Sequence, residues 1–178
     1  MLKALKNTRS AALRGLTLIE GLLFLGIAAI VIVSAVAFYN NASNSSKMNQ
    51  AQTQIQAYIS GVKTLYASRD SYASVSNALV ITAGKAPENA IRGANGLRNP
   101  WGGATNITGS NNYFEIEMDS LTDDVCTSVL SAGMLDNGSI FRIEANSTAF
   151  TNGNSPDPAD AAAACSSPTS NTITFRVR

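Results

Sequence analysis

The sequence predicts an α+β fold, in which one long N-terminal helix packs on an antiparallel β-sheet head. Three patterns support this prediction. Residues 21–46 contain no charged side chain and begin with a long apolar run. Apolar residues at heptad spacing then continue over residues 48–65, which is typical of an amphipathic helix. The later part of the chain holds short segments of alternating polarity, without regular strand–helix alternation, which favours an antiparallel sheet over a parallel one.

The start of the apolar run carries the most informative chemistry. Four basic residues and no acid precede it: Lys3, Lys6, Arg9 and Arg14. Glu20 is the only charged residue near the start of the run. An acid at the centre of a membrane helix costs roughly 2.5–3.5 kcal/mol, and less toward the membrane surface. Glu20 is therefore a candidate functional residue, and a free amine created by cleavage between Gly15 and Leu16 would be a natural partner for it.

The segment Gly15-Leu16-Thr17-Leu18-Ile19-Glu20 resembles the processing site of type IV prepilins. The resemblance implies that residues 1–15 are a leader, that prepilin peptidase cuts after Gly15, and that the new N-terminal amine of Leu16 is methylated. It also implies that Glu20 pairs with the amine of a neighbouring subunit during assembly. The 15-residue leader and a first mature residue other than phenylalanine resemble the type IVb branch.

An ordinary secretory signal peptide is the alternative for this segment. Cleavage after Ala35-Val36-Ala37 would then release a soluble periplasmic binding domain. Residues 21–38 are an 18-residue, mainly apolar run, which is at the lower end of a membrane span and longer than a usual signal-peptide core. Glu20 would also have no role in a signal peptide. We therefore expect residues 16–38 to be a transmembrane segment before assembly and the filament core afterwards.

Composition limits the other functions. The 178-residue chain has a net charge of +1, and removing the leader's four positive charges leaves 1 − 4 = −3. The remaining basic residues are scattered, which argues against a nucleic-acid surface. The chain has no histidine, which excludes a His-dependent triad and a His-rich metal site. Glu115 and Glu117 are explained by a solvated strand face, and residues 152–160 lack the spacing of an EF-hand loop. We expect no enzyme activity, no cofactor and no metal.

One helix is predicted over residues 16–69, about 80 Å long at 1.5 Å per residue. Its second half carries an apolar stripe made of Met48, Ala51, Ile55, Tyr58, Val62 and Leu65. The polar face predicted for it holds Lys47, Gln50, Gln54 and Lys63. The Asn/Ser-rich residues 40–46 weaken the helix locally. A homodimeric coiled coil is the alternative for the stripe, but three heptads without flanking charges are short for one.

The head is predicted over residues 70–178. Strands are expected at 113–118, 139–145 and 171–177, and apolar and polar residues alternate along the first and the last of them. A short helix is expected at 121–132, with Ser120 or Thr122 as its cap and Gly133 as its terminator. The only tryptophan, Trp101, lies in an Asn-Pro-Trp-Gly-Gly turn and is expected to cover part of the core. Residues 70–111 show no other specific pattern.

Cys126 and Cys165 are the only cysteines, and they are too far apart for CxxC chemistry or a zinc knuckle. A single disulfide is expected in an exported chain, and two buried free thiols are the alternative. Residues 151–170 are rich in Asn, Ser, Pro, Asp and Ala, and are not expected to order without that tether. The order of strand, short helix with the first cysteine, and second cysteine before a late strand also resembles type IVb pilins.

Together these resemblances imply the structural subunit of a type IVb-like pilus, a major pilin that polymerises with copies of itself. Its expected partners are prepilin peptidase, the inner membrane before assembly and the assembly machinery in that membrane. The assembled pilus would be extracellular and would serve adhesion, aggregation, motility or conjugation. A minor pilin or type II secretion pseudopilin is the alternative within the superfamily, since the Pro-Trp-Gly turn resembles turns of some pilins and of type II secretion pseudopilins alike. The alternative of another class is the soluble secreted binding domain.

Overall fold

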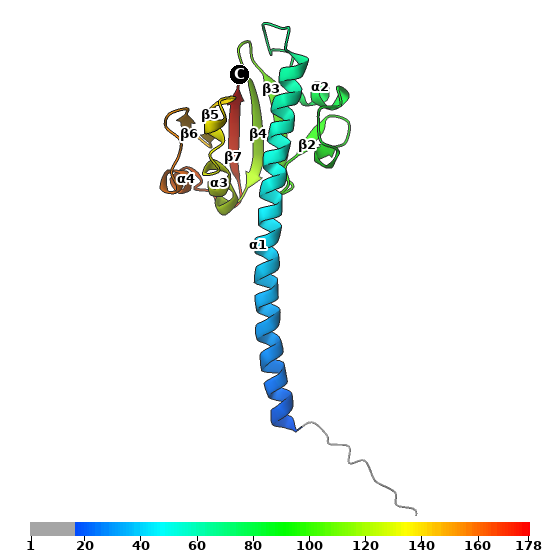
Figure 1. Cartoon of the computed structure of the whole chain (residues 1–178), viewed down its shortest axis with the longest axis vertical. Helices are drawn as coiled ribbons and strands as arrows, with labels where there is room; N and C mark the ends of the chain where they lie inside the picture. The colour runs from blue at the N-terminus through cyan, green and yellow to red at the C-terminus, as the bar shows by residue number, and fades with distance from the viewer. Residues whose placement is uncertain (1–16) are drawn as a thin grey trace, which may run out of the picture. The chain divides into compact units, whose positions relative to one another are not determined.

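The computed structural model describes residues 17–178, and the chain divides into two compact units. The first unit ends at Ser43 and the second runs from Asn44 to Arg178. Helix α1 (Leu18–Leu65) contributes residues to both units (Figure 1). The predicted leader, residues 1–15, and Leu16 lie outside the described residues.

The first unit consists of the N-terminal part of α1. The helix begins after Thr17, whose hydroxyl accepts a hydrogen bond from the Glu20 amide at 3.3 Å. That bond satisfies one of the amides that a helix N-terminus leaves without an intrahelical partner. In the described part of the chain, α1 is the one helix long and apolar enough to cross a membrane.

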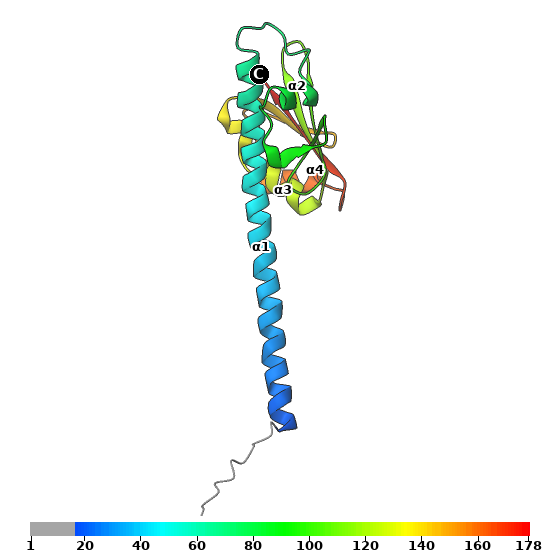
Figure 2. The same ribbon diagram turned by 90° about the vertical axis from the view of Figure 1, so that its right-hand side faces the viewer.

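The second unit is a helix on a sheet. Its elements after α1 are α2 (Asn77–Thr82), η1 (Glu88–Ala90), β1 (Ile91–Arg92), β2 (Gly96–Arg98), β3 (Ala104–Gly109), β4 (Phe114–Leu121), α3 (Asp123–Leu130), η2 (Met134–Asn137), β5 (Ile140–Ala145), β6 (Thr148–Thr151), α4 (Pro158–Ala164) and β7 (Asn171–Val177). The strands form one sheet in the order β1-β2-β3-β4-β7-β5-β6, and Figure 2 shows the C-terminal part of α1 running alongside it.

Every strand pair in the sheet is antiparallel, as the sequence predicted. The last strand, β7, lies in the middle between β4 and β5, so the C-terminus of the chain holds the two halves of the sheet together. Ile116 of β4 pairs with Phe175, and so does Ile143 of β5. Burial alternates along both β4 and β7, which gives the sheet one apolar face and one polar face.

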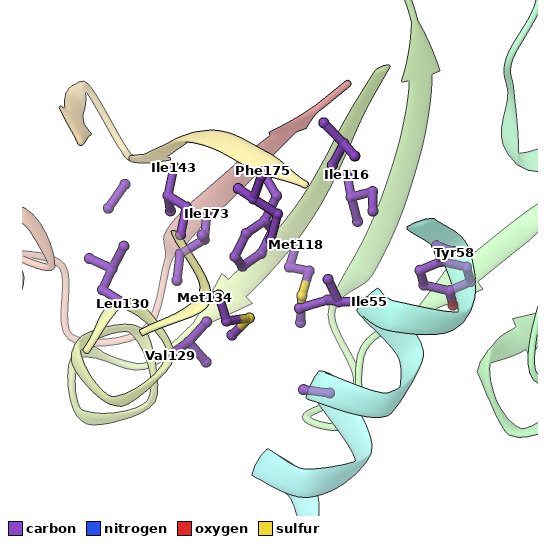
Figure 3. Close-up of a cluster of buried hydrophobic side chains, with 14 of the residues drawn as sticks. Ile55, Tyr58, Ile116, Met118, Val129, Leu130, Met134, Ile143, Ile173 and Phe175 are labelled. Atoms are coloured by element: carbon purple, nitrogen blue, oxygen red, sulfur yellow. The ribbon is translucent and has the colours of Figure 1, made fainter. Parts of the chain in front are cut away.

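The predicted stripe of α1 covers the apolar face of the sheet. Ala51, Ile55, Tyr58 and Val62 are all buried, while Met48 and Leu65 at the ends of the stripe are half-buried. In the core, Ile55 lies near Met118 and Phe175 of the sheet, with Val129, Leu130 and Met134 farther along the same face (Figure 3). Helix-on-sheet packing is therefore what closes the head, and the coiled-coil alternative would have required this stripe to be free.

The structure corrects the predicted polar face of α1 at one residue. Gln54 was assigned to that face, but it is only 4% exposed. The turn after β2 covers this flank of the helix, where Gln54 and Gln50 share a cavity with Arg98 and Asn99. Heptad spacing identifies the centre of a buried face, but it does not show how far a covering loop extends around the helix.

Two predicted boundaries also differ. Helix α1 ends at Leu65 rather than residue 69, and a turn closed by the Arg69 amide on the Tyr66 carbonyl follows it. Helix α3 is shorter than the predicted 121–132, with Thr122 at its N-cap and Ser131 rather than Gly133 at its C-cap.

Within residues 151–170, which the disulfide tethers at Cys165, the structure forms a short helix that the sequence analysis did not predict. In α4 the Asp157 carboxylate accepts hydrogen bonds from the amides of Ala159 and Asp160, both at 2.8 Å. Pro158 follows at the first helical position, where its missing N–H is not needed. A capping aspartate, a proline and a run of alanines together favour a short helix, despite the polar composition around them.

Candidate functional site

The N-terminal part of α1 is apolar on every side. Its large apolar side chains are between 53% and 85% exposed. They are Leu18, Ile19, Leu22, Leu23, Phe24, Leu25, Ile27, Ile30, Val31, Ile32, Val33, Val36, Phe38 and Tyr39. Fully burying a side chain of this size contributes about 1.5–3 kcal/mol. A helix that is apolar all round is stable only inside a bilayer or among other apolar helices.

Glu20 is the one charged side chain on this segment. It lies in the first turn of α1 and is exposed, two residues from the described start of the helix. A carboxylate in that position interacts favourably with the N-terminal end of the helix dipole. Gly15 and Leu16, which the sequence analysis connected with Glu20, lie outside the described residues.

In the second unit, the structure joins Cys126 to Cys165 by a disulfide with Cα atoms 5.8 Å apart. Cys126 lies within α3 and Cys165 is the C-cap residue of α4. Both cysteines are buried, and α4 packs against α3 through them and through Ala161 and Ala164. The bond therefore fixes α4, which has few other buried side chains, to the helix beside the sheet.

A buried asparagine completes this attachment, and the sequence analysis did not single it out. Asn171 at the start of β7 is fully buried, and its side chain donates to the Leu121 carbonyl at 3.1 Å. Its side-chain oxygen accepts from the Ser167 amide and from the Asn146 side chain, both at 3.0 Å. Asn146 in turn donates to the Ala164 carbonyl at 2.9 Å. These bonds connect β4, β7 and the end of α4, and no periodic pattern indicates them.

A second asparagine organises the turn that holds Trp101. The Asn99 side chain accepts from the amides of Trp101 and Gly103 and donates to the Asp119 carbonyl at 2.8 Å. Trp101 is partly buried and packs against the core, as expected from the sequence. The Asn-Pro-Trp-Gly-Gly pattern therefore indicated the turn correctly, but not the contact with the end of β4.

The polar face of the sheet carries a ladder of ion pairs. Arg176 of β7 pairs with Glu115 of β4 at 2.7 Å and with Glu144 of β5 at 3.8 Å, and Glu144 also pairs with Arg142 at 3.0 Å. Burial lowers the pKa of Arg176, but the hydrogen bond and charge of Glu115 outweigh that effect and raise it. Glu115 and Glu117 are thus partners of Arg176 and Asn106, and nothing in their geometry resembles a catalytic pair.

No group of three or more acids or cysteines that could hold a metal ion occurs within residues 17–178.

A family model described as PilS N terminal matches residues 45–178, which is nearly all of the second unit. The chain belongs to the PilS N-terminal family. Curated relatives in this comparison are the major structural subunits of the bundle-forming pilus of Escherichia coli O111:H- and of E. coli O127:H6. Each is 28% identical over 179 residues, which cover 91% of this chain and 93% of the relative.

Solved structures show the same fold. The type IV b pilin from Salmonella typhi aligns with a TM-score of 0.58 and 24% identity, covering 71% of this chain and 97% of that one. TcpA, a type IV pilin from Vibrio cholerae El Tor biotype, aligns with a TM-score of 0.56 and 14% identity, covering 75% of this chain and 99% of that one. The fold is therefore that of a type IV pilin, in agreement with the α+β prediction.

Proposed function

We propose that the chain is the structural subunit of a type IVb-like pilus, which polymerises through the N-terminal part of α1 into an extracellular filament. The observation that supports this most directly is the helix segment 18–39, whose large apolar side chains are exposed on every side. A filament core made of many such segments buries those side chains, and the membrane buries them beforehand. The pilus subunits among its relatives match along nearly the whole chain, the apolar segment included.

Processing is the second part of the proposal. Prepilin peptidase cuts between Gly15 and Leu16 and the new amine of Leu16 is methylated, while the chain is anchored in the inner membrane. The basic leader stays on the cytoplasmic side, as the positive-inside rule requires. Assembly machinery in that membrane then adds the processed subunit to the filament.

Glu20 has a role in register. In one subunit, Glu20 and the Leu16 amine are four residues apart in the sequence, and this is the spacing at which two groups on a helix face the same side. In the filament, a staggered neighbour brings its amine to Glu20, and a wrong stagger leaves a buried carboxylate unpaired, which is costly. The apolar side chains provide most of the association energy, and Glu20 selects the stagger.

Deletion of the chain tests the proposal for the whole protein. Cells that lack it should have no filaments of this type in electron micrographs, and a plasmid copy should restore them. Unchanged filaments in the deletion strain, or filaments that persist at a reduced number as expected of a minor subunit, would contradict the role of major subunit.

Glu20→Val tests the register role. We expect the variant to be cleaved and to remain in the membrane at the normal level, while filament number falls at least tenfold. Ser34→Val is the matched control, because it also removes a polar group from the apolar segment but only one that bonds its own helix, at the Ile30 carbonyl. Normal filament numbers from Glu20→Val would refute the register role, and loss of the subunit from the membrane would place its effect before assembly.

A further inference from the structure

The polar face of the sheet, which α1 does not cover, has two ends of opposite charge. The four longest strands, β3, β4, β7 and β5, bring every second side chain to this face. In its middle, the ladder of ion pairs described above consists of two acids, Glu115 and Glu144, and two bases, Arg142 and Arg176. The ladder neutralises itself, so the side-chain charges that remain are those at its two ends.

One end carries an exposed arginine that is already held in place. Arg178 follows β7, and its guanidinium carbon lies 4.3 Å from the centre of the Phe141 ring. Phe141 is the extra residue of a bulge in β5, and its ring also meets the Tyr113 ring edge-on at 5.9 Å. Stacking restrains a long side chain but leaves its N–H donors free. Among the side chains that the structure describes, none accepts a hydrogen bond from this guanidinium.

The other end carries two acids. The Asn106 side chain donates to Glu117 at 3.0 Å and to Asp119 at 3.4 Å. Neither carboxylate has a basic partner within residues 17–178. The arginines of the edge strands, Arg92 and Arg98, belong to β1 and β2, which are at least two strands away from β4. This end of the face is therefore acidic along β4.

The two ends cannot neutralise each other within one head. Phe114 of β4 pairs with Val177 of β7, so Arg178 is level with the position before Phe114. Asp119 lies six positions farther along the sheet, which is about 20 Å at about 3.3 Å per residue. Two heads whose polar faces meet with antiparallel strands can instead place Arg178 of each beside Glu117 and Asp119 of the other. With parallel strands, Arg178 would meet Arg178, and like charges repel.

We propose that the polar face of the sheet is a contact between two filaments, in which heads pair face to face with antiparallel strands and Arg178 of each binds Glu117 and Asp119 of the other. This inference rests on the proposed function, since a filament that buries α1 leaves the opposite face of the sheet for other contacts. The contact is isologous, because the same surface is used on both sides. In the head, α1 runs along β4 and β7 (Figure 1), so the paired filaments point in opposite directions.

The size of the face determines how strong one contact is. The eight residues of β4 are about 26 Å long and four strands are about 19 Å wide, which gives about 500 Å² per head. Stable interfaces bury about 800 Å² on each partner, so one pair of heads is held weakly. Repetition along two filaments adds many such contacts. Arg178 contributes to each at low entropic cost, because Phe141 already restrains it, and its planar group can donate two bonds to one carboxylate.

Mixing two charge variants tests the pairing. Washed, sheared filaments carrying Arg178→Glu, or Asp119→Lys, should each sediment at low speed at least fivefold less than the wild type, because like charges then meet at both ends of the contact. A mixture of the two should recover at least half of the wild-type sedimentation, because positions 178 and 119 of the two partners again carry opposite charges at both ends. Normal association of either variant alone, or no recovery in the mixture, would overturn the interface.

Two control variants separate this contact from other effects. Arg69→Glu makes the same change in net charge, at an exposed residue of the turn after α1. Thr172→Val removes the hydroxyl that donates to Asp119 at 3.0 Å and leaves every charge in place. Both should associate like the wild type. If Arg69→Glu weakens association as much as Arg178→Glu does, only net charge matters and the interface is overturned.

Cross-linking gives a direct readout that does not need a charge reversal. Arg178→Lys keeps the charge and supplies an amine, which a carbodiimide joins directly to a carboxylate in contact with it. Associated filaments should yield a covalent dimer in which position 178 is linked to Asp119 or Glu117. Because these positions are about 20 Å apart in one head, the link joins two subunits. Dispersing the filaments in about 1 M salt, where charges are screened beyond about 3 Å, should abolish it.

Three outcomes would overturn the interface. They are associated filaments without that linked peptide, a link that persists after the filaments are dispersed and so lies within one filament, and washed wild-type filaments that no longer associate, which would assign the face to another molecule. Absence of filaments from the wild-type chain would instead refute the proposed function.

Discussion

Loss of the Cys126–Cys165 bond is expected to be the most damaging single change to the head. The two cysteines are 39 residues apart in sequence. On the chain-entropy model, closing a loop of that size lowers the entropy of the unfolded chain by about 13 cal/mol/K, which is about 4 kcal/mol at 25 °C. A domain of this size is stable by roughly 5–15 kcal/mol, so a large part of the total depends on this bond.

The measurement is urea unfolding of the purified subunit in detergent, followed by Trp101 fluorescence. Trp101 is the only tryptophan and shares a surface pocket with Asp124 and Val125 of α3, so its emission reports the environment of the bonded helix. Cys126→Ala/Cys165→Ala should lower the free energy of unfolding by about 3–5 kcal/mol. Reduction of the wild-type protein should have a similar effect without creating the small cavities of the alanine variant.

Two controls separate the tether from local packing. Ala162→Gly, at an exposed position of α4, weakens that helix but keeps the disulfide and the packing on α3, and should lower the free energy of unfolding by only about 1 kcal/mol. Residues 158–164 of the cysteine variant should exchange their amide hydrogens much faster than β7 does, because α4 loses its main attachment. If the free energy of unfolding of the cysteine variant falls by less than about 1 kcal/mol, the view that the disulfide holds this region is refuted.

Three other substitutions test particular contacts of the head, each by chemical denaturation. Asn171→Ala should lower the free energy of unfolding by about 2–4 kcal/mol, because it leaves the buried partners of that side chain unpaired. A decrease of less than about 1 kcal/mol would contradict this. Gly109→Ala should lower the free energy of unfolding by at least about 2 kcal/mol, since a Cβ there would collide with the Tyr72 carbonyl oxygen. An unchanged free energy of unfolding would show that the loop around Tyr72 can move away. Tyr58→Phe should be neutral or stabilising at pH 7, because the buried hydroxyl has no partner among the described residues, and a loss above 1 kcal/mol would reveal one.

The Tyr58 variant also changes the pH dependence. Burial raises the pKa of Tyr58 from 10.0 to about 12. Because the folded pKa is the higher one, the stability from this group is complete below pH 10 and is lost as pH rises toward 12, by about 2–3 kcal/mol. Tyr58→Phe should flatten the stability profile in that range, and an unchanged profile would mean that Tyr58 does not titrate differently in the folded state.

Periodic patterns predicted the parts of the fold that they govern directly. The heptad stripe identified the buried face of α1, and alternation identified β7 to the residue. Both succeed because each element is long enough to repeat its pattern and because one of its faces is buried.

The parts that were not predicted depend on contacts between distant residues. Strands β1 and β2 are two and three residues long, too short for any alternation to appear. Gly109 is small because the Tyr72 carbonyl approaches it, and Asn171 is buried because Leu121 and Ser167 lie beside it. Among the candidate site residues, the cysteine pair could be predicted because only one pairing exists. The burial of Gln54 could not be predicted, since Gln54 is indistinguishable from an exposed glutamine until the turn at Asn99 is placed.

The intact mass of the principal protein in sheared, purified filaments tests the central claim most directly. If the chain polymerises through a processed N-terminal helix, the mass should equal that of residues 16–178 with one added methyl group and the disulfide intact. Filaments whose principal protein is a different chain, or recovery of this chain only in the soluble periplasm with its N-terminus at residue 38, would contradict the account.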